Sequence, residues 1–268
     1  MLTVFDLIGY GADKVQLFLL LTMRIGGVML TAPIFSHNSI PRRIAVAITL
    51  ILALVLMPLL VNTPVPQSQT LIELALLCLK EVLFGVLIGL VFNLVFLGVR
   101  LAGSIVSYQI GFAMANVVDP NSSEQVSVIG EIWFMIATLI FLCLNGHHII
   151  ISGLADSFRA VPMGTVMLSG PIGEWLIKYS ALVFVLAVKL AAPVIVTVFL
   201  VEVAMGVLAR TMPQMNIFIV GFPLKIFTGL LMFGLSLPVF SYVLTKTCAN
   251  LDNELAHLMH LFQARGAG

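Results

Sequence analysis

Charged residues are scarce in this chain. Only 9% of its 268 residues are Asp, Glu, Lys or Arg, whereas 60% are hydrophobic and the mean hydropathy is +1.15. A soluble domain is about one quarter charged, and a water-soluble fold with so few charges could not cover its own surface. The composition therefore excludes an ordinary soluble domain and predicts a membrane-associated protein, with length for about six to eight helices that cross a bilayer.

Several other absences narrow the class of protein. The chain has 13 Lys and Arg against 12 Asp and Glu, so it lacks the excess of positive charge that a nucleic-acid-binding protein needs. The three cysteines, Cys78, Cys143 and Cys248, are too far apart to indicate a metal cluster or a disulfide framework, and we expect them to be small packing residues. Residues 1–10 carry no positive charge and no A-x-A-like site follows the first apolar run, so we expect no cleaved signal peptide.

Motifs for catalysis are also missing. The chain has no Gly-rich phosphate loop, no H-E-x-x-H and no G-x-S-x-G. The adjacent His147 and His148 point to different faces and lack an accompanying Asp, Glu or Cys set, so we expect neither a metal site nor a cofactor. The sequence thus favours a protein that is not an enzyme.

Turn chemistry divides the apolar sequence into helices. The expected apolar segments are residues 15–35, 44–61, 71–99, 101–118, 126–144, 147–160, 179–208 and 216–245. Thr70 with Glu73 forms a capping box that predicts a helix start. Asp119-Pro120 and a second capping box, Ser122 with Gln125, predict another helix that ends near Asn145-Gly146.

Proline interrupts the later apolar segments. Residues 210–216 break the helical pattern around Pro213, and Pro193, Pro223 and Pro238 lie within otherwise apolar stretches. The sequence therefore predicts an all-α, membrane-associated helical bundle of kinked and split hydrophobic helices, in a single domain over residues 1–268.

The C-terminal tail has a different pattern. Apolar residues recur at helical spacing between polar ones from Leu251 to Phe262, which predicts a short amphipathic helix at about residues 247–263. Two alternatives remain open for this helix: it lies against a partner or the membrane interface, or it packs as the terminal helix of the same protein.

Ionisable residues lie inside the apolar segments. Arg24, Lys189 and Glu202 have no opposite charge three or four residues away, and Lys189 and Glu202 point about 140° apart around one helix. Each would cost about 2.5 to 3.5 kcal/mol at a bilayer centre, so we expect all three to face protein or water. An ion relay, buried structural ion pairs and helices that are not conventional spans all remain possible at this point.

Two further features concern packing and orientation. Gly85-x-x-x-Gly89 predicts close helix packing, within the chain or between subunits. Arg42 and Arg43 indicate a cytoplasmic loop by the positive-inside rule, although no other loop has a comparable cluster.

Residues 103–120, GSIVSYQIGFAMANVVDP, mix small, polar and large apolar side chains. Such a mixture suits backbone that is held in protein or lines a cavity. One interpretation is an interior helix with small residues for close packing. The other is a constriction or plug with Phe112 and Met114 as the apolar obstruction, since hydrophobic constrictions exclude water and methionine adapts its shape.

Taken in order, six segments resemble the R-subunit family of the flagellar type III export gate. They are RIGGVMLTAPIFS at 24–36, LKEVLFGVLIG at 79–89, the 103–120 segment, NGHH at 145–148, KLAAPVIVTVFLVE at 189–202 and ARTMPQMNIFIVGFP at 209–223. The resemblance extends over nearly the whole chain. It implies a subunit of the bacterial inner membrane and flagellar basal body, which joins P and Q subunits in a helical assembly and contacts the B subunit.

The resemblance also implies a role in export. Unfolded rod, hook and filament proteins would pass through the centre of the assembly, and the R subunit itself would not be an enzyme. The candidates for the gate or plug are Ser107, Tyr108, Gln109, Gly111, Phe112, Met114, Asn116, Asp119 and Pro120. The candidates for buried charge and subunit packing are Arg24, Glu81, Arg100, Lys189, Glu202, Arg210 and Lys225.

Two other classes of function compete with this interpretation. A multi-pass secondary transporter would use Lys189 and Glu202 to bind ions or substrate near the midplane, but such transporters usually contain internal repeats and none is evident. An intramembrane enzyme that uses Glu131 or the histidine pair has the least support.

Overall fold

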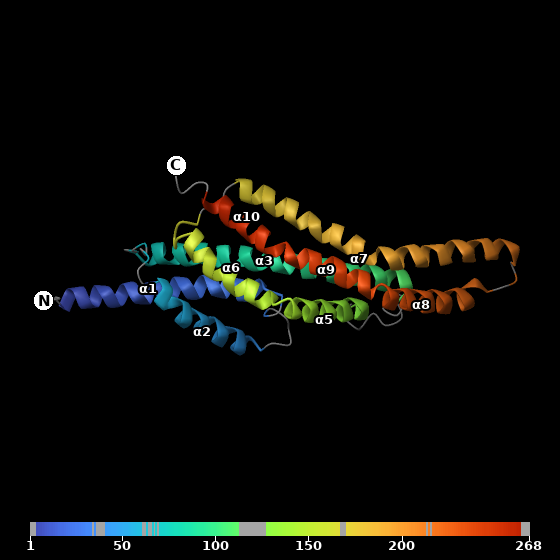
Figure 1. The fold of residues 1–268 in the computed structure, drawn as a ribbon, viewed down its shortest axis with the longest axis horizontal. Coiled ribbons are helices and arrows are strands. Elements are labelled where there is room, and N and C mark those ends of the chain that lie inside the picture. Colours follow the sequence, from blue (N-terminus) through green and yellow to red (C-terminus); the bar gives the residue numbers. More distant parts are fainter. Residues whose placement is uncertain are drawn as a thin grey trace. The chain divides into compact units, whose positions relative to one another are not determined.

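The computed structural model describes residues 4–33, 35, 41–60, 63, 66, 68, 70–112, 127–166, 170–212, 214 and 216–263. In this part of the chain all regular structure is α-helical, as predicted (Figure 1). The helices are α1 (Val4–Thr31), α2 (Arg42–Leu60), α3 (Leu71–Ile110), α5 (Val128–Cys143), α6 (Gly146–Ala160), α7 (Gly170–Thr211), α8 (Ile217–Leu235), α9 (Leu237–Ala249) and α10 (Leu251–Gln263).

Polar caps fix several helix ends. The Glu73 amide donates to Thr70 Oγ1 at 3.2 Å and the Thr70 amide donates to Glu73 Oε2 at 3.4 Å, which confirms the capping box before α3. Ser127 caps α5 by accepting from the Gly130 amide at 3.0 Å. The predicted start signals at Asp119-Pro120 and at Ser122 with Gln125 lie outside the described residues.

The end of α5 agrees with the sequence to within two residues. The helix ends at Cys143, and Asn145 adopts the left-handed conformation with φ 56° before α6 begins at Gly146. Asparagine tolerates this conformation better than most residues, because its short polar side chain forms local hydrogen bonds. The chain therefore turns at the predicted Asn145-Gly146 pair.

Two of the predicted apolar segments share one helix. Residues 71–99 and 101–118 are expected as separate apolar segments, whereas α3 runs without a break from Leu71 to Ile110. Arg100, which separates the two segments, is compatible with a continuous helix because arginine is a good helix former. Its guanidinium lies 4.0 Å from the ring centre of Phe134 on α5.

The prolines act differently from one another. Pro193 and Pro223 lie inside α7 and α8, so neither splits its helix, whereas the chain breaks at Ser236 immediately before α9, whose second residue is Pro238. The break predicted around residue 213 is confirmed, because α7 ends at Thr211 and α8 begins at Ile217.

The chain forms two compact units. The first contains residues 1–93, 145–177 and 250–268. In its core, α1 and α3 approach closely at Gly85, where an added Cβ would overlap the carbonyl oxygen of Arg24, and at Gly89, where it would overlap Thr31 Oγ1. Gly85-x-x-x-Gly89 is therefore used for packing within the chain.

The tail helix α10 packs into this first unit. Its apolar residues Leu251, Leu255, Leu258 and Met259 are buried. A Cβ at Gly153 of α6 would contact Leu255, and the ring centre of Phe262 lies 4.6 Å from that of Phe84. Of the two alternatives for the amphipathic tail, the structure shows a terminal helix packed on its own chain; α9 already occupies the chain up to Ala249, so the tail helix is shorter than expected.

The second unit contains residues 94–144 and 178–249. Its core is aromatic: Trp133 of α5 stacks on Phe233 of α8 at 5.4 Å and on Phe240 of α9 at 5.2 Å, measured between ring centres. Phe96 of α3 contacts Phe141 edge to face at 5.5 Å. These contacts hold α5 against α3, α8 and α9.

Four described helices are long and apolar enough to cross a membrane, or up to six if each of two bent helix pairs counts as one span. The composition predicted about six to eight. The upper count agrees with the low end of that range, and the count of four single helices is lower because α3 and α7, with 40 and 42 residues, each use the apolar sequence of about two spans of 20 residues. The apolar helices indicate a membrane location.

Candidate functional site

The predicted gate segment begins on the last turns of α3 and continues into the turn after it. Of its candidates, Ser107, Tyr108 and Gln109 lie on the helix, and Gly111 and Phe112 form the turn. Tyr108 and Phe112 are exposed, by 77% and 40%. The remaining candidates, Met114, Asn116, Asp119 and Pro120, lie outside the described residues.

Gly111 ends α3 in a defined way. Its amide donates to Tyr108 O at 3.1 Å, and the Phe112 amide donates to Ser107 O at 3.1 Å. This pair of hydrogen bonds is a Schellman motif, which needs a left-handed residue, and Gly111 has φ 102°. The motif directs the chain away from the helix axis immediately before Phe112. The sequence analysis listed Gly111 as a gate candidate but missed this role.

The neighbour of this turn is Phe222 of α8, in the same unit. A Cβ added to Gly111 would lie 3.6 Å from Phe222 Cδ1, which is ordinary van der Waals contact. One residue earlier, Ile110 is fully buried, and its side chain occupies the space that a Cβ on Gly229 of α8 would need. The end of α3 is therefore held against α8, while Tyr108 and Phe112 stay exposed.

A second contact joins α3 to the start of α5. Ser127 Oγ donates to Gly103 O at 3.2 Å, and a Cβ on Gly103 would overlap the Cα of Gly130. Beside this contact, Arg100 Nε lies 3.8 Å from Glu131 Oε1. The sequence analysis did not identify Ser127 as a helix cap. No Glu or Gln follows it three residues later to complete a capping box, so the only signal was a serine before an apolar segment.

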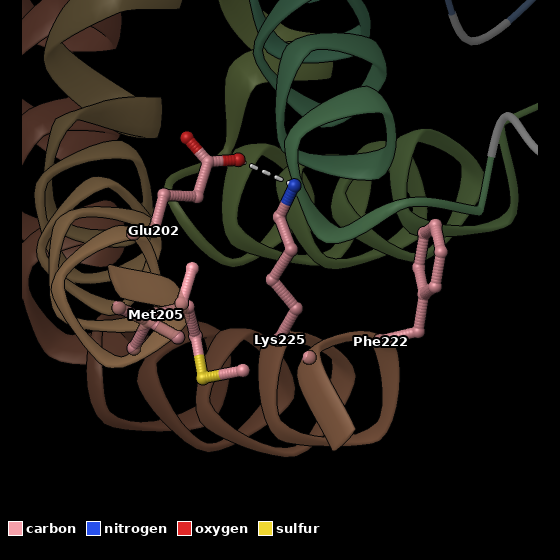
Figure 2. A pocket seen from close by; sticks show the side chains of 8 residues that line it. Glu202, Met205, Phe222 and Lys225 are labelled. Atoms are coloured by element: carbon pink, nitrogen blue, oxygen red, sulfur yellow. Dashed lines mark ion pairs between the residues drawn. The ribbon is translucent and has the colours of Figure 1, made fainter. Parts of the chain in front are cut away.

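Glu202 and Lys225 form an ion pair between α7 and α8. Glu202 Oε1 lies 2.5 Å from Lys225 Nζ, with 43% and 22% of the side chains exposed. Figure 2 shows the two side chains reaching toward each other, with Met205 below them and Phe222 to one side of Lys225, in a pocket of about 320 Å³ that these residues line. The sequence analysis correctly found that Lys189 does not supply the partner of Glu202, but it did not assign Lys225.

Arg24 and Glu81 form a buried ion pair inside the first unit. Arg24 Nε lies 2.6 Å from Glu81 Oε2, and neither side chain is exposed. Arg24 Nη1 donates to Ser157 O at 2.9 Å and to Val161 O at 3.1 Å, while Glu81 Oε1 accepts from the Gly164 amide at 2.8 Å. The pair thus joins α1, α3 and α6 to the turn after α6.

The remaining charged candidates point outward. Lys189 of α7 is exposed on the same side of the helix as Val185 and Val188, which are themselves 46% and 56% exposed. Arg210 at the end of α7 is also exposed. In the described part of the chain, no carboxylate lies within ion-pair distance of either cation.

The residues considered for catalysis belong to two different units, with His147 and His148 in the first and Glu131 in the second. The rings of His147 and His148 lie 4.4 Å apart, and Glu131 pairs with Arg100. Among the described residues, no group of three His, Cys, Asp or Glu side chains is placed to hold a metal ion.

Comparison with known proteins supplies the family. The family described as Bacterial export proteins, family 1, matches residues 15–251. The flagellar biosynthetic protein FliR of Bacillus subtilis (strain 168) is 31% identical over 252 residues, which cover 93% of this chain and 96% of that protein. FliR of Escherichia coli (strain K12) is 32% identical over 238 residues, 88% of each chain, and FliR of Aquifex aeolicus (strain VF5) is 32% identical over 246 residues, 92% of this chain and 95% of the relative. With its helical architecture and matches over nearly its whole length, the chain belongs to the FliR family of flagellar export proteins.

Proposed function

We propose that this protein is a non-catalytic structural and gating subunit of the flagellar type III protein export channel. It assembles with P and Q subunits, contacts the B subunit and the rest of the export apparatus, and contributes a plug to the pore. Unfolded rod, hook and filament proteins are the cargo. The protein is located in the bacterial inner membrane, at the flagellar basal body. Residues 1–268 act as one R-subunit domain. Membership of the FliR family supports this assignment.

The length of the exposed apolar surface on α7 carries the proposal. The helix has 42 residues and is therefore about 63 Å long, whereas the hydrocarbon core of a bilayer is about 30 Å thick. Large apolar side chains are exposed along it from Ile177, 74% exposed, to Leu208, 41% exposed. That distance is about 46 Å, longer than a bilayer covers even at a tilt of about 40°.

An apolar surface that extends beyond the lipid needs protein to cover it. Neighbouring export-gate subunits supply that cover in the proposed assembly. Lys189 and Arg210 fit the same interpretation, because two exposed cations on this helix are available to carboxylates of other subunits. The other charged candidates act within the chain: Arg24 with Glu81, Arg100 with Glu131, and Glu202 with Lys225.

The end of α3 supports the proposed plug. The Schellman turn at Gly111 leads the chain out of the helix, and Tyr108 and Phe112 are exposed on either side of it. Exposed aromatic side chains at a helix end suit a hydrophobic constriction that excludes water. In the proposed plug, Phe112 and Met114 obstruct the pore, and the polar residues among the candidates from Ser107 to Pro120 shape the loop around them.

Co-expression tests the assembly. The chain is produced with the P and Q subunits of the same export system, purified in mild detergent and analysed by native mass spectrometry. The expected result is a stable hetero-oligomer that contains this chain. A monomer or homodimer that ignores both subunits would instead favour the secondary transporter, for which the Glu202–Lys225 pair in its apolar pocket is the natural binding site.

A further inference from the structure

A groove separates α1 from α2 in the first unit. The two helices form a hairpin, blue in Figure 1, and the groove between them has a volume of about 770 Å³. Its walls are mainly apolar and flexible, with Met23, Met29 and Leu30 on α1 and Val46 and Leu50 on α2. None of the described gate candidates or paired charges lines this groove, and the proposed function assigns it no role.

The groove is open along one side. Leu30 is 70% exposed, Val46 58% and Leu50 40%. Its size is within the range of about 300 to 1,000 Å³ that is typical of small-molecule sites, and long methionine side chains adapt to chains of variable shape. A linear apolar ligand is the kind of molecule that such walls would hold.

One end of the groove is cationic. Arg42 lines it at the first residue of α2, and Arg43 follows; both are exposed, and they are the only charged residues of the helix. Neither arginine forms an ion pair with any carboxylate in the described part of the chain. The guanidinium group matches the geometry of phosphate, so the groove combines an apolar body with an end that favours a phosphate group.

The length of α2 suits a helix that crosses the bilayer. With 19 residues the helix is about 28 Å long, which fits a hydrocarbon core of about 30 Å, unlike α7. Little of α2 is buried, with only Thr49, Ala53, Leu56 and Leu60 inside the fold. If α2 crosses the bilayer, its two arginines lie at one interface, beside the phosphate groups of the lipids. Basic pockets between membrane helices bind anionic lipid head groups in this way.

We propose that the groove between α1 and α2 binds one anionic phospholipid. An acyl chain lies along Met23, Leu30 and Val46, and the phosphate contacts Arg42 and Arg43. The ligand chemistry is that of a phosphodiester with long alkyl chains and a net negative charge. This inference does not depend on the plug or on the P and Q subunits.

Native mass spectrometry of the full chain in detergent, after removal of bound lipid, tests the site. The probes are phosphatidylglycerol with two long acyl chains, phosphatidylcholine as the zwitterionic comparison, and inorganic phosphate. We expect phosphatidylglycerol to bind more tightly than phosphatidylcholine. Arg42→Gln with Arg43→Gln should weaken phosphatidylglycerol binding about 25-fold, about five-fold for each arginine. Arg159→Gln, an exposed charge loss outside the groove, is the matched control and should leave binding unchanged.

The apolar part of the site needs its own variant. Val46→Trp fills the groove from an exposed position, so it should weaken lipid binding while the chain stays folded. Val55→Trp, at a position 62% exposed on the same helix and outside the groove, is the control. Equal binding of the two lipids, or unchanged lipid binding by Val46→Trp, would overturn the proposal. So would phosphate binding as tightly as the lipid, which would indicate a simple anion site, or a loss of subunit association alone in Val46→Trp, which would indicate a protein occupant.

Discussion

Arg24 Nε and Glu81 Oε2 lie 2.6 Å apart, with no exposed surface on either side chain. The guanidinium also lies between two aromatic rings, 4.8 Å from the centre of Phe84 and 4.5 Å from that of Phe158. A buried pair of this kind is costly to break, because the remaining partner is left as an uncompensated charge. The pair therefore ties the stability of the first unit to two residues that are 57 positions apart.

Replacing Glu81 with Leu should destabilise the protein strongly. The expected loss is about 3 to 5 kcal/mol, since Arg24 would remain charged and buried. Thermal unfolding of the purified chain in detergent measures it. Combining Glu81→Leu with Arg24→Met should recover part of the loss by removing the orphaned charge.

The control for this prediction is Asp156→Ala, which breaks the exposed pair between Arg159 and Asp156 and should change the melting temperature little. A Glu81→Leu variant that melts like the control would show that the pair does not hold the unit together.

The pair between Glu202 and Lys225 predicts a charge-swap result. Glu202→Lys places two cations side by side in the pocket between α7 and α8, so the yield of assembled complex should fall. Because the partner is known, Glu202→Lys with Lys225→Glu should restore most of the yield. Size-exclusion chromatography of the co-expressed complex measures it. Normal yield from the single variant would remove a packing role, and failure of the double variant would show that Glu202 has a partner in another subunit.

Gly111→Ala should lower stability and disturb the turn before Phe112. The cost is about 1 to 3 kcal/mol, because an L-residue at φ 102° is strained. The nearest side chain, Phe222, leaves room for the new methyl group, so the effect comes from the backbone and not from a clash. Thermal unfolding in detergent measures the change.

Gly234→Ala is the matched control for Gly111→Ala. Gly234 lies in α8 with nothing within 4 Å of an added Cβ, and alanine in a helix is favoured over glycine by about 0.5 to 1 kcal/mol. The control should therefore be as stable as the parent or slightly more stable. Equal stability of the two variants would show that the turn tolerates an L-residue.

The fold was largely predictable because its signals are local. The capping box at Thr70 and Glu73, the turn at Asn145 and the break near residue 213 each depend on a few adjacent residues. The sequence showed two apolar segments on either side of Arg100, but it did not show that one helix, α3, contains the first segment and the start of the second. A charged residue interrupts an apolar segment without ending a helix, since arginine is a good helix former.

The candidate site was predictable only in part, for the same reason. The sequence indicated that Arg24 and Glu202 need partners, but Glu81 and Lys225 are distant in the chain and become identifiable only when the helices are packed. Likewise, the groove beside Arg42 depends on how α1 and α2 diverge, and no local pattern encodes its volume. The residue types that need neighbours were evident from the sequence, whereas the identities of those neighbours were not.

Removing the proposed apolar obstruction should open the pore without preventing assembly. Phe112 is 40% exposed at the turn after α3, and Met114 follows two residues later, outside the described residues. We therefore expect Phe112→Ala with Met114→Ala to raise ion conductance of the assembled complex in planar bilayers, since a smaller constriction no longer excludes water. Tyr242→Ala, which shortens an exposed aromatic side chain on α9 that is not a gate candidate, separates a specific obstruction from a general loss of apolar surface. Unchanged conductance in a fully assembled double variant would remove these two residues from the plug, even if the chain remains a subunit of the export gate.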